Sequence, residues 1–225
     1  MRVQLFGERC SGTNYVQQLI ADNTGAEFTT AMGFKHNFPG EPVGPVDLVI
    51  VCARHPYTWV QSLYQTPWGA WDTYCGMSMD EFLRTPWRSR YDEYDVGQGS
   101  ELLGQESTAD WCPETREPYP NPVRMRAGKY AAWLALSSRL PVVVAQLEPW
   151  QADPIGMLAM LGRYGLKTKE LFTPCVHYKG REHCGRYAPR VFQKLTGSQV
   201  DWINSQLNSD IEEKLGYSVT RLVTP

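Results

Sequence analysis

Apolar residues along this chain fall into two recurring patterns, continuous runs and helical spacing. Continuous runs begin at about residue 3 and recur over 47–53 and 140–145, and they predict parallel strands buried on both faces. Helical spacing follows these runs and predicts helices over 15–20, 57–64, 124–136, from Asp153–Pro154 onward, 188–195 and 198–207. Because strands that alternate with helices form a sheet between helical layers, we expect a three-layer α/β/α fold with a central, mostly parallel sheet.

The stretch from residue 65 to 121 departs from this alternation. It is rich in tryptophan, tyrosine, proline, glycine and acidic residues, and its one clear helical signal is the capping-box pair Ser78 and Glu81. The 225 residues suffice for one large α/β domain or two small ones, with a sizeable core. We expect a single domain over residues 1–225, in which 65–121 is an irregular insertion.

A glycine-containing loop separates the first strand from the first helix. It reads Gly7-Glu-Arg-Cys-Ser-Gly-Thr13, and such a loop presents backbone N–H groups and the positive end of a helix dipole to an anion. The spacing of Gly7 and Gly12 matches the start of a Walker A loop, but Thr13-Asn14 stands where Lys-Ser or Lys-Thr is expected. The pattern favours a P-loop NTPase-like phosphate-binding loop; the alternative is an ordinary strand-to-helix turn with two glycines.

A second anion site is indicated where the apolar run 47–53 ends. Arg54 follows this run, at the edge where open α/β sheets bind ligands, and Ser62 lies eight residues later. A guanidinium and a hydroxyl at such a corner suit a second phosphate. The alternative is a surface arginine that caps the end of a strand.

Two more segments carry residues suited to this chemistry. Lys179-Gly180-Arg181 combines two cations with an accessible backbone, although a solvated basic turn explains it equally well. His36, preceded by Lys35, lies in a loop, where a histidine can act as a general base at neutral pH or serve a structural role.

Composition narrows the class of partner. The 22 basic and 24 acidic residues nearly balance, which gives no basic footprint for nucleic acid. No apolar run of 18 residues indicates a membrane span, and no signal-peptide pattern is visible. We therefore expect no nucleic-acid partner, no membrane partner and a cytoplasmic location.

The six cysteines point the same way. None belongs to a C-x-x-C pair, and Cys52 lies inside an apolar run, which favours reduced thiols. Cys175, His177, His183 and Cys184 lie within ten residues, but their spacing matches no usual zinc arrangement, so we predict no metal site.

Taken in order, these segments resemble the sulfotransferases that use 3′-phosphoadenosine-5′-phosphosulfate (PAPS). Gly7–Thr13 is similar to the family's 5′-phosphosulfate loop, and Arg54–Ser62 to its 3′-phosphate motif, R-x-P-x-x-x-x-x-S. Phe34–Pro39 resembles the segment with the catalytic base, and Tyr178–Arg181 the C-terminal K-G element. Residues 146–166 are similar to a stretch that packs against the sheet and carries no chemistry. The resemblance covers nearly the whole chain outside 65–121.

One position departs from the family pattern. The family's loop usually has a lysine directly before S/G-G-T, where it contacts the oxygen that bridges sulfur and phosphate, and here Cys10 stands at that position. Arg9 or Lys35 is our hypothesis for the cation that replaces it. His36 also follows Lys35 directly, without the intervening residue that is common in the family.

The resemblance implies sulfuryl transfer from PAPS to a hydroxyl or amine of a carbohydrate or small molecule, with adenosine 3′,5′-bisphosphate (PAP) as product and no metal. It implies that Cys10, Ser11, Gly12, Thr13 and Asn14 bind the 5′-phosphosulfate, that Arg54, Ser62, Lys179, Gly180 and Arg181 bind the 3′-phosphate, and that His36 is the base.

The acceptor is expected to lie against aromatic residues of the insertion, several of which a satellite core would explain as well: Trp68, Trp71, Tyr74, Trp87, Tyr91, Tyr94, Trp111 and Tyr119. Two alternatives remain open. One is a P-loop kinase or related phosphotransferase, and the other is a catalytically weak nucleotide-binding protein of the same fold.

Overall fold

The structure, a computed structural model, describes residues 1–70, 72–176 and 191–218, with the side chains of residues 94 and 95 excepted. Contacts within the chain divide it into two compact units. The first comprises Met1–His55 and Trp133–Gln193, and the second comprises Pro56–Ala132 and Lys194–Pro225. The expected single domain over residues 1–225 stays a prediction.

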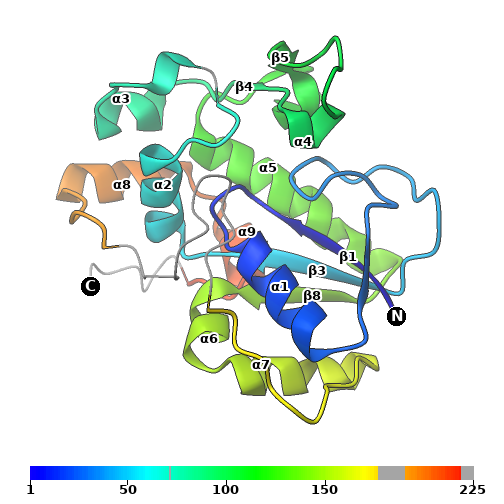
Figure 1. The fold of residues 1–225 in the computed structure, drawn as a ribbon. Coiled ribbons are helices and arrows are strands. Elements are labelled where there is room, and N and C mark those ends of the chain that lie inside the picture. Colours follow the sequence, from blue (N-terminus) through cyan, green and yellow to red (C-terminus); the bar gives the residue numbers. More distant parts are fainter. Residues whose placement is uncertain (71, 177–190, 219–225) are drawn as a thin grey trace. The chain divides into compact units, whose positions relative to one another are not determined.

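A four-stranded parallel sheet forms the centre of the first unit (Figure 1). Its strands lie in the order β2-β1-β3-β8, and all three neighbouring pairs are parallel. The strands are β1 (Arg2–Gly7), β2 (Glu27–Thr29), β3 (Leu48–Ala53) and β8 (Val142–Gln146). Helices lie around this sheet, so the expected α/β class with a parallel sheet is confirmed, and the arrangement is consistent with three layers.

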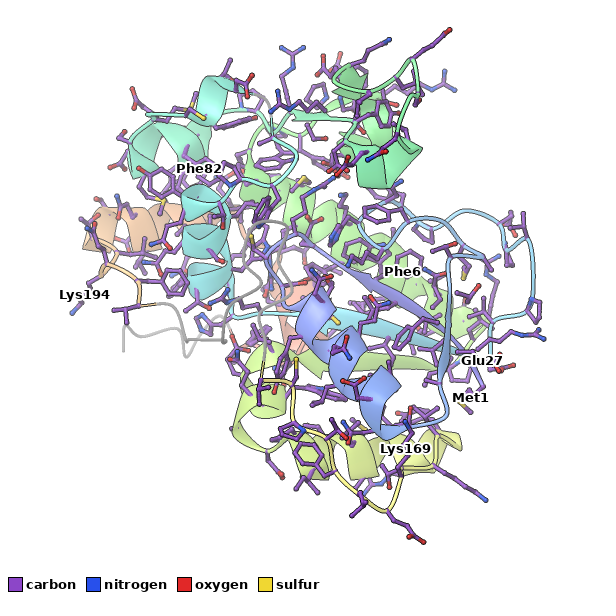
Figure 2. All side chains as sticks on the ribbon, in the orientation of Figure 1. Met1, Phe6, Glu27, Phe82, Lys169 and Lys194 are labelled. Atoms are coloured by element: carbon purple, nitrogen blue, oxygen red, sulfur yellow. The ribbon has the colours of Figure 1, made fainter. Side chains whose placement is uncertain are left out.

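Burial explains why these segments are strands. All six residues of β3 are buried, and only Arg2 of β1 is exposed, as a strand covered on both faces requires. Side chains alternate between the faces, so Leu5 packs with one cluster while Phe6, labelled in Figure 2, stacks on Trp133 at 5.9 Å between ring centroids. The three-residue β2 was not expected, because Glu27–Thr29 has no continuous apolar run.

One face of the sheet is covered by α1 (Thr13–Asn23), α6 (Leu147–Ala152) and α7 (Pro154–Leu161). Asp153 caps α7 and Pro154 is its first residue, as expected, since the Asp153 side chain accepts a hydrogen bond from the Gly156 N–H at 2.9 Å. Ile155 of this helix is 59% exposed. It lies on the side of α7 that faces away from the sheet.

The second unit is built from helices and very short strands. The expected helices near 57–64, 124–136 and 198–207 are confirmed, and so is the Ser78–Glu81 capping box. The α-helices of the second unit are α2 (Pro56–Gln65), α3 (Met79–Arg84), α4 (Glu93–Val96), α5 (Pro122–Ala135, whose last residues belong to the first unit), α8 (Gly197–Gln206) and α9 (Ser209–Lys214). Two-residue strands pair as β4 (Ser89–Arg90) with β5 (Glu106–Ser107) and as β6 (Trp111–Cys112) with β7 (Glu117–Pro118).

The helix expected over 188–195 is wrong for residues 191–195, which have no regular structure, and residues 188–190 lie outside the described part. Val191 is 92% exposed, so this segment has no continuous apolar face to bury. Within the described residues, no helix is both long and apolar enough to cross a membrane.

Aromatic residues of the insertion form part of the core of the second unit. Tyr74 and Trp87 stack at 5.3 Å, and both contact Phe82 edge-on. Trp87 donates its ring N–H to Asp110 at 3.0 Å, and Asp110 also pairs with the buried Lys129. For Tyr74 and Trp87, therefore, the core explanation is correct, and neither is available to stack on an acceptor.

A buried ion pair joins α5 to α9. The Arg126 guanidinium donates to both oxygens of Glu212 at 2.7 and 2.8 Å, and both side chains are essentially inaccessible to solvent. The guanidinium carbon also lies 5.1 and 4.8 Å from the ring centroids of Trp59 and Tyr130. Burial opposes the charge of Arg126, but the Glu212 carboxylate outweighs that effect and raises the guanidinium pKa above its usual value.

Replacing Glu212 by alanine should destabilise the protein strongly, because it leaves the Arg126 charge buried without its counter-ion. We expect the free energy of unfolding to fall by about 3–5 kcal/mol in urea denaturation. The neighbouring Glu213 is exposed on the same helix, so Glu213→Ala is the matched control and should change the value by at most about 0.5 kcal/mol. Equal effects of the two substitutions would contradict this account.

Candidate functional site

The loop of residues 8–12 connects the carboxyl end of β1 to the first residue of α1. Ser11 closes the loop on itself, since its N–H and its hydroxyl both donate to the Glu8 carbonyl at 3.1 and 2.6 Å. Gly12 is the N-cap residue of α1 and no side chain caps the helix there. Because the first N–H groups of a helix need acceptors, this terminus favours an anion.

Close contacts leave too little room for a β-carbon at Gly7, the last residue of β1, and at Gly12. A β-carbon at Gly7 would lie 2.6 Å from the Cys52 carbonyl oxygen of β3, and one at Gly12 would lie 2.5 Å from Leu147 Cδ1. Gly12 also has φ 86°, in the left-handed region that favours glycine. Cys10 adopts φ 67° as a non-glycine residue, so the backbone of the loop is held in an uncommon conformation at two points.

The segment that carries Lys35 and His36 attaches to the last residue of β1. The Gly7 N–H donates to the Lys35 carbonyl at 3.0 Å, and His36 Nδ1 lies 2.6 Å from the Gly7 carbonyl oxygen. A carbonyl oxygen can only accept, so Nδ1 carries the proton of the neutral imidazole and Nε2 is the basic nitrogen. His36 is thus held with the tautomer that a general base acting through Nε2 needs.

Lys35 places a cation at the start of α1. Its ammonium donates to Asn14 Oδ1, one residue into the helix. Burial lowers the pKa of the Lys35 ammonium, and the charge of Arg9 lowers the pKa further. An anion bound at the helix terminus would relieve this cost, since an opposite charge stabilises the ammonium form.

Cys52, below this segment, is not a candidate nucleophile. Burial raises the pKa of its thiol to about 12, so the thiol stays protonated at neutral pH. The five cysteines that the structure describes form no disulfide, and the expected reduced state stays a prediction.

Arg54 reaches back from the end of β3 to the loop. Its Nη1 donates to the Cys10 carbonyl at 3.3 Å, and its guanidinium carbon lies 5.0 Å from the ring centroid of Phe192. The next residue, His55, donates its backbone N–H to Glu148 Oε1 at 2.8 Å. Arg54 is therefore held against the loop that Gly12 ends.

The structure thus brings several predicted residues together within the first unit. They come from the β1–α1 loop, the segment after β2 and the end of β3: Arg9, Cys10, Ser11, Gly12, Thr13, Asn14, Lys35, His36 and Arg54. Ser62 lies buried in α2, in the second unit, so its pairing with Arg54 stays a prediction. Lys179, Gly180 and Arg181 lie outside the described residues.

Sequence reasoning missed three residues of this arrangement, Leu147, Glu148 and Phe192. Residues 146–166 were expected to pack against the sheet without further role, yet Leu147 contacts Gly12 and Glu148 binds His55. Glu148 lies two residues after the end of β8, close to a strand end as Arg54 is, so the same signal could have found it. For Phe192 the sequence offers no comparable signal.

Within the described residues, no group of histidine, cysteine and acidic side chains is arranged to hold a metal ion. Of the four residues weighed as zinc ligands, only Cys175 is described, and it packs against the core of the first unit. A pocket on α1 is lined by Asn14, Gln17, Gln18 and Ala21, so it adjoins the loop through Asn14.

No protein-family model matches this chain, and no curated protein and no solved structure matches it either. The resemblance to sulfotransferases stays a prediction that rests on the residues themselves.

Replacing Gly12 by alanine should disturb the loop through both its backbone conformation and the contact with Leu147. We expect the free energy of unfolding to fall by about 1–3 kcal/mol. Gly25 is the matched control, because a β-carbon there meets nothing within 4 Å and Gly25→Ala should be neutral or slightly stabilising. Chemical denaturation of the two variants measures the difference, and a Gly12→Ala protein as stable as the control would refute the steric argument.

Proposed function

We propose that this protein is a sulfotransferase that moves the sulfuryl group of PAPS to a hydroxyl or amine of an acceptor, a carbohydrate or other small molecule. The observation that carries the proposal is the contact of Arg54 with the Cys10 carbonyl. It joins two segments that the sequence suggested for two different phosphates of one nucleotide. His36, fixed by the Gly7 carbonyl, lies at the same edge of the sheet.

In this proposal the loop and the start of α1 bind the 5′-phosphosulfate. The N–H groups of residues 10, 12 and 13 and the side chains of Thr13 and Asn14 face this end of the donor, since the Ser11 N–H is bonded within the loop. Arg54, with Ser62 and the segment 179–181, binds the 3′-phosphate. Two anionic groups on one ligand would account for cations supplied by separate parts of the chain.

Transfer then needs one base and one stabilised leaving group. His36 Nε2 takes the proton of the acceptor hydroxyl or amine while that atom forms a bond to sulfur. The bond between sulfur and the bridging oxygen breaks, and PAP leaves with the electron pair. Positioning and charge stabilisation provide most of the rate in this kind of transfer, and the scheme uses no metal.

We assign Lys35 to the bridging oxygen, because Cys10 stands where the family's loop has the lysine that contacts this oxygen. The Lys35 ammonium already contacts Asn14 at the helix terminus, and its lowered pKa favours donation of a proton or hydrogen bond to a developing negative charge. Arg9, a buried residue of the β1–α1 loop, contributes to the positive potential there.

Ligand selectivity tests the proposal against its rivals. PAP should raise the melting temperature at micromolar to millimolar concentration, because a ligand that binds only the folded state stabilises it by mass action. ATP with Mg²⁺ should give a clearly smaller shift. A larger shift with ATP and Mg²⁺ would favour a kinase. A transfer assay with radioactive PAPS and a panel of sugars and phenols tests the other rival. If the protein binds PAP but labels none of these acceptors, it is a weakly catalytic nucleotide-binding protein.

Substitution of His36 by asparagine distinguishes the catalytic role of the histidine from its structural hydrogen bond. The asparagine amide lies where Nδ1 lies and can still donate to the Gly7 carbonyl, but it has no basic nitrogen at the position of Nε2. Turnover should fall about 10²–10⁴-fold while the dissociation constant for PAP changes little. Full activity of His36→Asn in the radioactive PAPS assay would show that another group is the base.

A further inference from the structure

Three segments that follow the carboxyl ends of β1, β3 and β8 form a closed circuit of contacts. The register pairs Gly7 with Cys52 and Ala53 with Gln146, so the residues after these strands leave the same edge of the sheet (Figure 1). The β1–α1 loop contributes Cys10 and Gly12, the end of β3 contributes Arg54 and His55, and the first turn of α6 contributes Leu147 and Glu148.

Each pair of these segments is joined by one contact. Arg54 Nη1 donates to the Cys10 carbonyl at 3.3 Å, and the His55 N–H donates to Glu148 Oε1 at 2.8 Å. Leu147 closes the circuit, since its Cδ1 lies against the backbone of Gly12. The two contacting residues are consecutive in the second and third segments, and only Ser11 separates them in the loop, so a shift at one contact would reach the next over a short stretch of backbone.

Glu148 is the member of the circuit that ligand chemistry does not explain. A carboxylate near an anion site repels the ligand, so it needs another role there. Its Oε1 accepts a hydrogen bond from the backbone N–H of His55, the residue after Arg54. The next residue, Pro56, has no backbone N–H. The Glu148 bond therefore holds the last backbone N–H before α2 begins.

We propose that Glu148 is a positioning residue, which keeps Arg54 directed at the β1–α1 loop by holding the backbone of His55. The proposal rests on the proposed function for the ligand that Arg54 binds. In this role the carboxylate acts through its acceptor oxygen and not through its negative charge. A glutamine at this position would supply the same acceptor without the charge.

Two substitutions and one control test this role. Glu148→Gln keeps an acceptor for the His55 N–H, whereas Glu148→Ala removes it. Glu170 is an exposed acidic residue of the same unit, so Glu170→Ala is the control for loss of one negative charge. Unfolding by urea first establishes that each variant is folded.

The first measurement needs no ligand. Hydrogen exchange of the His55 amide should be at least about tenfold faster in Glu148→Ala than in the wild type, and nearly unchanged in Glu148→Gln and in the control. The Arg54 Nε–H resonance, assigned with Arg54→Lys, should move in Glu148→Ala alone. Unchanged His55 exchange and an unmoved Arg54 resonance in Glu148→Ala would overturn the proposal.

The second measurement is the dissociation constant for PAP. It should rise about tenfold or more in Glu148→Ala and stay within about threefold of the wild type in Glu148→Gln and the control. Equal loss in Glu148→Gln and Glu148→Ala would show that the charge matters and would overturn the proposal.

The two measurements keep this proposal separate from the proposed function. A wild-type protein that does not bind PAP refutes the proposed function, and the ligand-free measurements then decide alone whether Glu148 positions Arg54. If the wild type binds PAP and Glu148→Ala binds it equally well, the proposed function stands and the role of Glu148 is refuted.

Discussion

The parallel pairing of β1, β3 and β8 is the constraint from which the candidate site follows. Parallel strands in one register send their next residues to the same edge of a sheet. Because Gly7 lies opposite Cys52 and Ala53 lies opposite Gln146, the loop, Arg54 and Glu148 are neighbours although they are 40 to 140 residues apart. A slip of one residue in either pairing would turn these groups to opposite faces.

Much of the fold followed from local pattern. Strands β1, β3 and β8 were predictable because buried parallel strands read as continuous apolar runs, and the caps of α3 and α7 because their side-chain acceptors stand at fixed spacing. The short β2 was not, because Glu27–Thr29 is half-exposed and is held by pairing with β1. The helix expected over 188–195 failed for its described residues because spacing alone does not supply a surface to pack against.

The site divides in the same way. The β1–α1 loop and Arg54 were predictable, since glycines and strand ends are visible in the sequence. The tautomer of His36 was not, because it depends on a carbonyl 29 residues away. Tyr74 and Trp87 illustrate the converse limit: aromatic composition suggested a binding surface, and only burial assigns these two to a core. Composition does not tell whether an aromatic side chain is buried in a core or exposed to a ligand.

The ion pair between Arg126 and Glu212 has a consequence for how the chain is made. Neither compact unit is one continuous stretch, and the second contains residues from both the middle and the end of the chain. During synthesis on the ribosome, Arg126 emerges long before the helix that carries its counter-ion. The Arg126 charge can therefore be enclosed only after residues 209–214 have been synthesised, and until then it stays in water.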